Sequence, residues 1–432
     1  MTVSVFILSL LAAMAIGMPI AYALLVCGVT LMAFLAATSH VVTFDSQILA
    51  QRFVEGADNF PLLAVPFFLL AGEFMNAGGL SRRIVNLAMA WVGHFRGGLG
   101  YVTVIAAVIM ASLSGSAVAD TAALAALLIP MMRAAGYDVG RASGLIASGG
   151  IIAPVIPPSI GLIIFGVAGN VSITKLFLAG IVPGLLMGLA IGVTWWWVAK
   201  KENVRPAVKP PMADRLRITA EGGFALLLPI VIIGGMKFGV FTPTEAAVVA
   251  AVYSFCVGMF IYRELKWSAL YQLALAAGKT TAVVMFLVAA AMVSAWLITV
   301  ANIPTEVAAI LSPFMDNKML LMLVMMLLIV VVGTALDFTP TVLILTPVLM
   351  PVVLKAGIDP VYFGVLFIIN NAIGLVTPPV GTVLNVVCGV ARISMDTAFK
   401  GVLPFLIAQL AVLFLLVLFP AIVIVPLQWL MR

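Results

Sequence analysis

Long apolar runs separated by short polar breaks make up most of the chain. A helix needs roughly 20 apolar residues to cross a hydrocarbon core about 30 Å thick, and the sequence offers many runs of that length. The runs are continuously apolar and do not alternate with polar residues, so a closed β-barrel is excluded. The pattern therefore predicts an all-α polytopic membrane protein.

The first half of the chain, residues 1–199, combines ordinary spans with two interrupted apolar stretches. Spans are predicted near 3–20, 22–40, 60–77 and 174–199. The interrupted stretches cover 99–133 and 138–170, and each contains residues near its middle that disfavour helix. We interpret 99–133 as a helical hairpin and 138–170 as a broken helix that crosses the membrane. Exchanging these two assignments would change the charge balance across the membrane only slightly.

An amphipathic segment at 80–97 precedes the predicted hairpin. Its apolar face carries Leu80, Ile84, Leu87, Trp91 and Phe95. Its other faces carry Arg82, Arg83, Asn86 and His94. A helix of this kind should lie along the membrane interface. It is either a plain surface helix or a mechanical arm that joins two moving parts.

The second half of the chain repeats the first at a constant offset of 221 residues. The matched pairs are Pro130 and Pro351, Gly136 and Gly357, Asp138 and Asp359, Pro157 and Pro378, and Pro158 and Pro379. We therefore predict a second repeat at 221–432, with an arm near 264–278, a hairpin at 319–354 and a broken helix at 360–391. Because each repeat is predicted to cross the membrane five times, an odd number, the second repeat should be inverted relative to the first.

The only long polar segment, KKENVRPAVKPPMADRLR, lies between the repeats, and we predict a linker at 200–220. The positive-inside rule places this basic linker in the cytoplasm, which puts the amino terminus in the periplasm. The net charge of +6 comes from basic residues at the ends of apolar segments and not from one patch, which argues against nucleic-acid binding. The amino terminus lacks a basic region before its apolar run, so we interpret it as the first span and not as a signal peptide.

Candidate chemistry lies where the interrupted stretches break. The four breaks have the sequences SLSGS, GGIIAPVIPP, GTALDFTP and NNAIGLVTPP. A broken backbone at this depth survives only where protein, water or a ligand satisfies its polar groups. Carbonyl-rich helix ends suit sodium, and amide-rich ends suit an anion such as a carboxylate. Hydroxyl groups near the breaks fit sodium coordination or ordinary bonding within a helix: Ser112, Ser114, Thr334, Thr339 and Thr377.

Two aspartates lie close to the breaks, where an unpartnered charge would be costly. Asp337 precedes a proline-interrupted run and is predicted either to cap a half-helix or to take part in transport. Asp120 follows the SGS sequence in the same way and is predicted to be a structural cap.

The residues needed for enzyme chemistry are scarce and scattered. His40 and His94 lie far apart, and the three cysteines stand singly in apolar sequence, so no zinc site or disulfide is indicated. No Ser-His-Asp or carboxylate-pair arrangement can be assembled near the breaks. The GKTT sequence at Gly278 lacks the upstream glycine of a Walker motif. We therefore expect neither an enzyme nor an ATPase.

Four motifs resemble one membrane-protein family and occur in its order. They are SGSAVAD from Ser114, IAPVIPPS ending at Ser159, GTALDFTPTVLILTPVLMP ending at Pro351, and GLVTPPVG ending at Gly381. Together they resemble the large membrane subunit of tripartite ATP-independent periplasmic (TRAP) transporters, and the resemblance covers essentially the whole chain. It implies a bacterial inner-membrane symporter that imports a small organic acid, such as a C4-dicarboxylate, sialic acid or a sugar acid, with sodium.

The resemblance also implies a mechanism and partners. In an elevator mechanism, a scaffold stays fixed in the membrane while a transport domain with both hairpins and both broken helices carries the substrate across. The expected partners are a small four-helix membrane subunit, a soluble periplasmic substrate-binding protein and membrane lipid. Sodium is the coupling ion, and no other cofactor is expected.

The family's two sodium sites can be carried over to matching positions in this chain. The first would use Ser112 and Ser114 with the backbone around Ala153, Ile156 and Pro158. The second would use Gly333 with Gly374, Thr377 and Val380. Candidates for substrate contact or capping are Asp337, Asp120, Pro157 and Pro378.

Two other kinds of membrane protein remain as alternatives. A dicarboxylate and sodium symporter of the same architecture would work without a binding protein. A channel would need a continuous polar path, whereas the breaks here are typical of paired closed sites.

Overall fold

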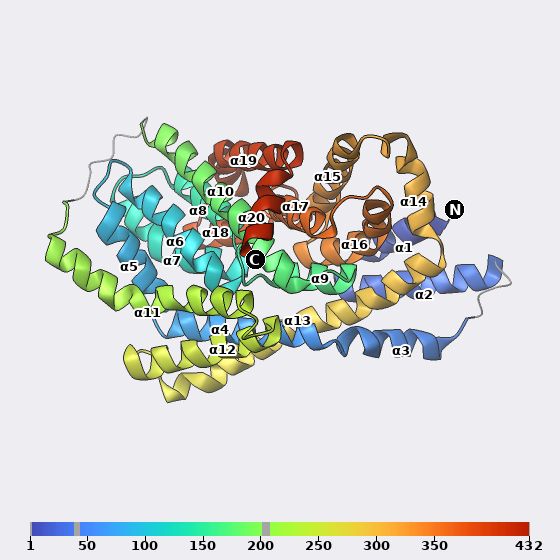
Figure 1. Ribbon diagram of the computed structural model, residues 1–432, viewed down its shortest axis with the longest axis horizontal. Coiled ribbons are helices and arrows are strands. Elements are labelled where there is room, and N and C mark those ends of the chain that lie inside the picture. The colour runs from blue at the N-terminus through green and yellow to red at the C-terminus, as the bar shows by residue number, and fades with distance from the viewer. Residues whose placement is uncertain (1, 39–43, 201–207, 432) are drawn as a thin grey trace.

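Figure 1 shows the computed structural model of the chain, which describes residues 2–38, 44–200 and 208–431. The described residues form helices and the turns between them, with no β-strand. Ten helical segments in these ranges are long and apolar enough to cross a membrane. His40, the end of the span predicted to reach residue 40, and residues 201–207 of the predicted linker fall outside the described ranges.

The first half contains ten α-helices and one short 3₁₀ helix within its described residues. Their bounds are α1 Thr2–Ala15, α2 Ile20–Thr38, α3 Ser46–Ala57, η1 Phe60–Leu63, α4 Ala64–Ala77, α5 Leu80–Val92, α6 Gly98–Ser114, α7 Ala117–Ala134, α8 Val139–Gly150, α9 Ile160–Gly169 and α10 Ile173–Ala199. The predicted hairpin at 99–133 corresponds to α6 and α7, and the predicted broken helix at 138–170 corresponds to α8 and α9.

The second half contains ten α-helices, one short π-helix and one short 3₁₀ helix within its described residues. Their bounds are α11 Met212–Lys237, α12 Pro243–Cys256, η2 Val257–Ile261, α13 Trp267–Val300, α14 Ile303–Leu311, η3 Ser312–Phe314, α15 Lys318–Ala335, α16 Phe338–Lys355, α17 Pro360–Gly374, α18 Thr382–Ala391, α19 Met395–Leu418 and α20 Ala421–Leu430. At an offset of 221 residues, α6 to α10 fall on α15 to α19 in turn. The hairpin predicted at 319–354 corresponds to α15 and α16, and the broken helix predicted at 360–391 to α17 and α18.

The structure differs from the predicted arm of the second half. Residues 267–278, most of the predicted arm, begin the 34-residue helix α13. At the same offset the helix that matches α5 is α14. In the first half, Pro61 interrupts the segment and separates α3 from α4, whereas its counterpart Ala282 allows one continuous helix.

The predicted linker at 200–220 is shorter in the structure, because α11 already begins at Met212. Pro211 precedes the helix, and no further proline occurs before Pro229. Asp214 lies in the first turn, where a negative charge interacts favourably with the helix dipole. The polar sequence after Pro211 is therefore the exposed beginning of a helix.

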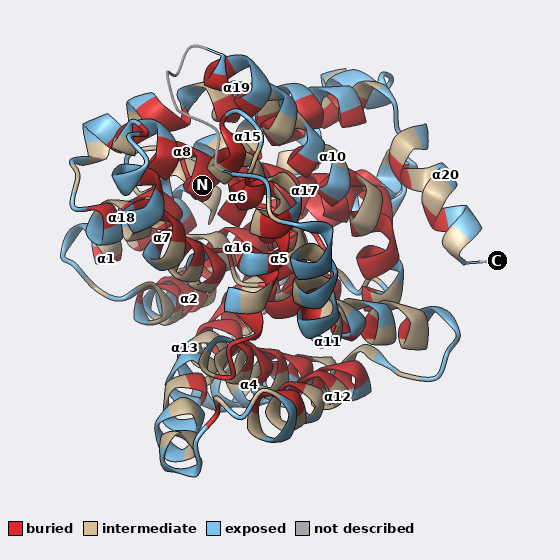
Figure 2. Ribbon diagram, turned by 90° about the vertical axis from the view of Figure 1, so that its left-hand side faces the viewer, coloured by how far each residue is buried: buried red, intermediate tan, exposed pale blue. Residues whose placement is uncertain are grey.

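The hairpins and broken helices of the two halves pack against one another. Helix α8 packs on α19, α9 on α16, and α7 on α18, so each half contributes to the same body. Helices α4, α12 and α13 lie together along another side of the molecule (Figure 1). Figure 2 shows buried residues around α16 and α17 in the middle and exposed residues on outer helices such as α11. Every residue of α17 except its first is buried.

Glycines allow α8 and α19 to touch backbone to backbone. A β-carbon placed on Gly401 would lie 1.9 Å from the carbonyl oxygen of Gly140, and one placed on Gly144 would lie 2.2 Å from the carbonyl carbon of Gly401. Small residues at helix crossings permit this approach in membranes. The contact joins the first broken helix to the last long helix of the second half.

Replacing Gly401 with valine should therefore destabilise the fold, at the upper end of the overpacking range, about 3 kcal/mol. The matched control is Gly389→Val, because a β-carbon at Gly389 meets nothing within 4 Å. Thermal unfolding of the purified chain in detergent measures the difference. If both variants melt at the same temperature, the α8–α19 contact does not hold the two halves together.

Candidate functional site

The tip of the first hairpin lies against the first broken helix. Helix α6 ends at Ser114, Gly115 has a φ of +65°, and the Ser116 side chain accepts a hydrogen bond from Ala119 N at the start of α7. A β-carbon on Gly115 would lie 2.3 Å from the carbonyl oxygen of Pro158. Glycine is needed here both for its positive φ and for this close approach. The hairpin tip is thus in direct contact with the α8–α9 break.

The first break offers several backbone oxygens. Residues 151–159 are all buried. The carbonyl of Ile152 accepts hydrogen bonds from Val155 and Ile156, and Ser159 Oγ donates to the carbonyl of Pro154. In the described part of the chain, no donor reaches the carbonyl oxygens of Ala153, Ile156 and Pro158. These three residues are the backbone ligands predicted for the first sodium site, and their oxygens are available as ligands.

The two predicted serines of this site have partners within the protein. Ser112 Oγ donates to the carbonyl of Ile109 at 2.6 Å, which is ordinary bonding within a helix. Ser114 Oγ donates to Asp120 Oδ1 and accepts from Ser116 N. Serine coordination of a cation would therefore require these hydroxyls to share or exchange their present partners.

Asp120 has a different position from the one predicted. Ser116 is the cap of α7, and Asp120 lies within the first turn. Its carboxyl group is almost fully buried, with Oδ1 bonded to Ser114 and Oδ2 without a partner among the described residues. A cap needs a non-helical backbone one position before the helix, which Ser116 has and Asp120 lacks. Asp120 instead anchors the Ser114 side chain.

The second hairpin also contacts the second broken helix, at positions that correspond to Ser112 and Ala153 of the first half. A β-carbon on Gly374, the last residue of α17, would lie 2.8 Å from the carbonyl oxygen of Gly333. No described donor bonds to that oxygen. The structure therefore brings together the two glycines predicted for the second sodium site, one from each element.

Asn371 lies beside the contact between Gly333 and Gly374, although the sequence analysis did not select it. Its Nδ2 donates to the carbonyl of Phe338 at 2.7 Å. Its Oδ1 is buried and has no partner among the described residues, and a β-carbon on Gly333 would lie 3.2 Å from it. An oxygen left free beside a free carbonyl suits a cation. The signal in the sequence was a pair of adjacent asparagines in an otherwise apolar helix.

The remaining residues predicted for the second site differ in whether their carbonyl oxygens already accept a hydrogen bond. Thr377 Oγ1 donates to the carbonyl of Ile373 at 2.9 Å, whereas the Thr377 carbonyl has no described donor. The carbonyl of Val380 is occupied, because Asn385 Nδ2 donates to it at 2.7 Å. Thr377 and Pro378 are partly exposed, whereas their counterparts Ile156 and Pro157 are buried. The second break is therefore the more accessible of the two.

Asp337 was predicted either to cap a half-helix or to take part in transport. It stands at the N-cap position of α16, but its side chain makes no capping hydrogen bond. Its Oδ1 instead accepts a hydrogen bond from Thr382 Oγ1 at 3.3 Å. Asp337 thus connects the second hairpin tip to the first residue of α18. Its role in transport stays a prediction.

The two halves meet at the level of the breaks. A β-carbon on Gly161, in the first turn of α9, would lie 2.6 Å from the ring of Phe338, in the first turn of α16. Pro157 and Pro378 lie at matched positions of the two breaks, and each is joined by a cis peptide bond to the proline that follows it. The tips, the breaks and the amide ends of α9 and α18 therefore belong to one region of the molecule.

Comparisons with known proteins give a consistent result. Residues 7–422 match the family described as "Tripartite ATP-independent periplasmic transporter, DctM component". The chain is 57% identical over 429 residues to the 2,3-diketo-L-gulonate TRAP transporter large permease protein of Escherichia coli, covering 99% of this chain and 100% of that one. It is 39% identical over 406 residues to the sialic acid TRAP transporter large permease protein of Vibrio cholerae, covering 94% of this chain and 93% of that one.

A solved structure supports the architecture. The YdaH transporter of Alcanivorax borkumensis superimposes with a TM-score of 0.65 over 93% of this chain and 97% of that chain, at 17% identity. At that level of identity the likeness concerns the fold alone.

Proposed function

Because the chain belongs to the DctM family of TRAP transporters and is a large permease of secondary transport in the inner membrane, we propose that it imports a small organic acid with sodium. The observation that supports this proposal is that each half has a contact between its hairpin and its broken helix, Gly115 with Pro158 in the first and Gly333 with Gly374 in the second. Each contact leaves backbone oxygens without hydrogen-bond donors: Ala153, Ile156 and Pro158 in the first half, and Gly333 and Thr377 in the second.

Oxygen ligands without a cluster of carboxylates favour a monovalent cation. Among the described residues, no group of three or more His, Cys, Asp or Glu side chains could hold a metal ion. Hard cations such as sodium prefer oxygen ligands, and a cluster of carboxylates would favour a divalent ion. The ends of α6 and α15 add the negative ends of two helix dipoles to these oxygens.

The anionic substrate would bind close to the same region. The amino-terminal ends of α9 and α18 follow the two breaks, and α18 has no side-chain cap. Free amides at a helix start favour a carboxylate. Since the Escherichia coli relative is named for 2,3-diketo-L-gulonate, a sugar acid of this kind is the first substrate to test.

An elevator movement fits the packing of the two halves. Both hairpins and both broken helices interlock through α8 with α19, α9 with α16, and α7 with α18, so they would move as one body. Helices α4, α12 and α13 would belong to the scaffold, and α5 would act as an arm. We place the second repeat inverted relative to the first, the linker in the cytoplasm and the amino terminus in the periplasm. A small four-helix membrane subunit and a periplasmic binding protein would complete the tripartite transporter.

Uptake of radiolabelled organic acids into proteoliposomes tests this function. The vesicles should contain this chain with a small TRAP membrane subunit, and a TRAP periplasmic binding protein should be added outside. We expect uptake only with an inward sodium gradient and the periplasmic protein together. Sodium-driven uptake without that protein would favour a stand-alone symporter. Passive flux of the organic acid, with no accumulation inside the vesicles under a sodium gradient, would favour a channel.

A further inference from the structure

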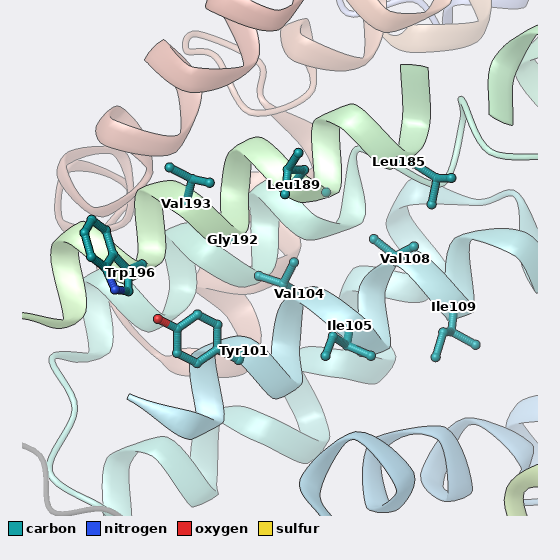
Figure 3. Close-up of a pocket in the computed structure, with 11 residues that line it drawn as sticks. Tyr101, Val104, Ile105, Val108, Ile109, Leu185, Leu189, Gly192, Val193 and Trp196 are labelled. Atoms are coloured by element: carbon teal, nitrogen blue, oxygen red, sulfur yellow. The ribbon is translucent and has the colours of Figure 1, made fainter. Parts of the chain in front are cut away.

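An apolar groove runs between α6 and α10. Figure 3 shows the residues that line it, and its volume is about 510 Å³. Gly188 and Gly192 form its floor on α10. A β-carbon on Gly188 would lie 2.5 Å from Val108 Cγ2, so the two helices touch there, whereas one on Gly192 would lie 3.9 Å from Val104 Cγ1. The groove is therefore a hollow left by missing side chains.

The two ends of the groove differ in chemistry. Tyr101 and Trp196 lie at one end, and Leu185 and Ile109 at the other (Figure 3). Amphipathic aromatic rings of this kind are enriched where the hydrocarbon core meets the headgroups. The aromatic end should therefore lie at the membrane interface, and the aliphatic end should point toward the middle of the bilayer.

Two cations lie at the aromatic end. Lys200 Nζ lies 3.3 Å from the centroid of the Trp196 ring. Arg96 Nη2 donates to the carbonyl of Lys200 at 3.2 Å, which brings the guanidinium to the same place. Both residues are exposed. This end of the groove thus combines an interfacial aromatic pair with positive charge.

The length of the groove matches one leaflet. From Leu185 to Trp196 the axis of α10 advances about 16 Å at 1.5 Å per residue. Half of a hydrocarbon core of roughly 30 Å is about the same length. A groove that begins at the interface and ends near the midplane fits one acyl chain and excludes a membrane-spanning partner helix, which needs the full thickness.

We propose that this groove binds a single anionic phospholipid from the leaflet on the side of the linker. One acyl chain lies over Gly188 and Gly192, and the phosphate lies between Lys200 and Arg96. A zwitterionic lipid can place a chain in the groove but lacks the net negative charge that two neighbouring cations attract.

Native mass spectrometry of the full chain, titrated with phosphatidylglycerol and with phosphatidylethanolamine, tests the site. Gly192→Leu fills the hollow and should weaken phosphatidylglycerol binding at least tenfold. The matched control is Gly223→Leu on α11, where a β-carbon meets nothing within 4 Å. If both leucine variants bind phosphatidylglycerol as the wild type does, the groove is not the site.

A charge variant tests the headgroup contact and keeps the proposal testable if Gly192→Leu fails to fold. Lys200→Ala should weaken phosphatidylglycerol binding about fivefold, the effect of one basic residue near a charged headgroup, and leave phosphatidylethanolamine unchanged. Lys237→Ala is the control, since Lys237 also lies beside an aromatic ring, that of Phe238, but away from the groove. Equal binding of the two lipids by the wild-type chain would overturn the proposal.

Discussion

Gly115→Ala is expected to lower sodium-driven uptake by about 100-fold. The new β-carbon would lie 2.3 Å from the carbonyl oxygen of Pro158, so the hairpin tip could no longer rest on the α8–α9 break. Overpacking costs up to about 3 kcal/mol, which corresponds to roughly 100-fold at tenfold per 1.4 kcal/mol. The Pro158 carbonyl would move away from its predicted place in the first sodium site. Uptake and sodium-dependent thermal stabilisation are the two measurements.

Gly136→Ala is the control that separates the loss of the contact between hairpin tip and break from the effect of backbone strain. Gly136 has a φ of +81°, so an alanine there is destabilised by about 1–2 kcal/mol in its left-handed backbone conformation, as an alanine at position 115 would be. A β-carbon there meets nothing within 4 Å. The control variant should have a lower melting temperature but retain sodium-driven uptake. Equal loss of uptake in both variants would mean that contact between tip and break is not required.

Asn371→Leu is expected to weaken sodium binding at the second site by about 10- to 100-fold. The change removes the free Oδ1 beside Gly333 and leaves the Phe338 carbonyl without its donor. An unsatisfied buried group costs about 1–3 kcal/mol, which matches that range. The shift of melting temperature with sodium concentration measures the affinity, because a ligand that binds only the folded state stabilises it.

The neighbouring asparagine provides the matched control. Asn370 Nδ2 donates to the carbonyl of Met326 at 2.6 Å, about two turns of α15 before Gly333. Asn370→Leu loses one buried hydrogen bond of the same kind, so the protein should be less stable at every sodium concentration. Its sodium affinity should stay that of the wild type. If Asn370→Leu and Asn371→Leu lose the same affinity, the second site does not include Asn371 Oδ1.

The spans and the helix breaks could be predicted from the sequence because residues close together in the chain determine them. Apolar length predicts spans, and proline and glycine mark the breaks, which is why the bounds of α6 to α9 and of α15 to α18 agree closely with the prediction. The 221-residue offset needs only a few fixed prolines and glycines to be recognised. The helix that matches α5, α14, could not be recognised from the sequence because it lacks the basic residues that make α5 conspicuous, and the start of α13 could not because a missing proline merges two helices into one.

The contacts within the site could not be predicted, because they join residues far apart in the chain. The partner of Asn371 lies 33 residues away, at Phe338, and the partner of Asp337 lies 45 residues away, at Thr382. The cap of α7 illustrates the same limit at short range. Ser116 and Asp120 are both plausible caps in sequence, and only the backbone conformation distinguishes them.

Binding of radioactive sodium to the purified chain at equilibrium tests the central claim most directly, because it needs neither substrate nor partner proteins. The account predicts two saturable sites in the wild type, and one site of unchanged affinity with the other weakened in each of Gly115→Ala and Asn371→Leu. Potassium should not compete at equal concentration. Absence of saturable sodium binding, or the same two sites in both variants, would contradict the assignment of a sodium site to each contact between hairpin tip and broken helix.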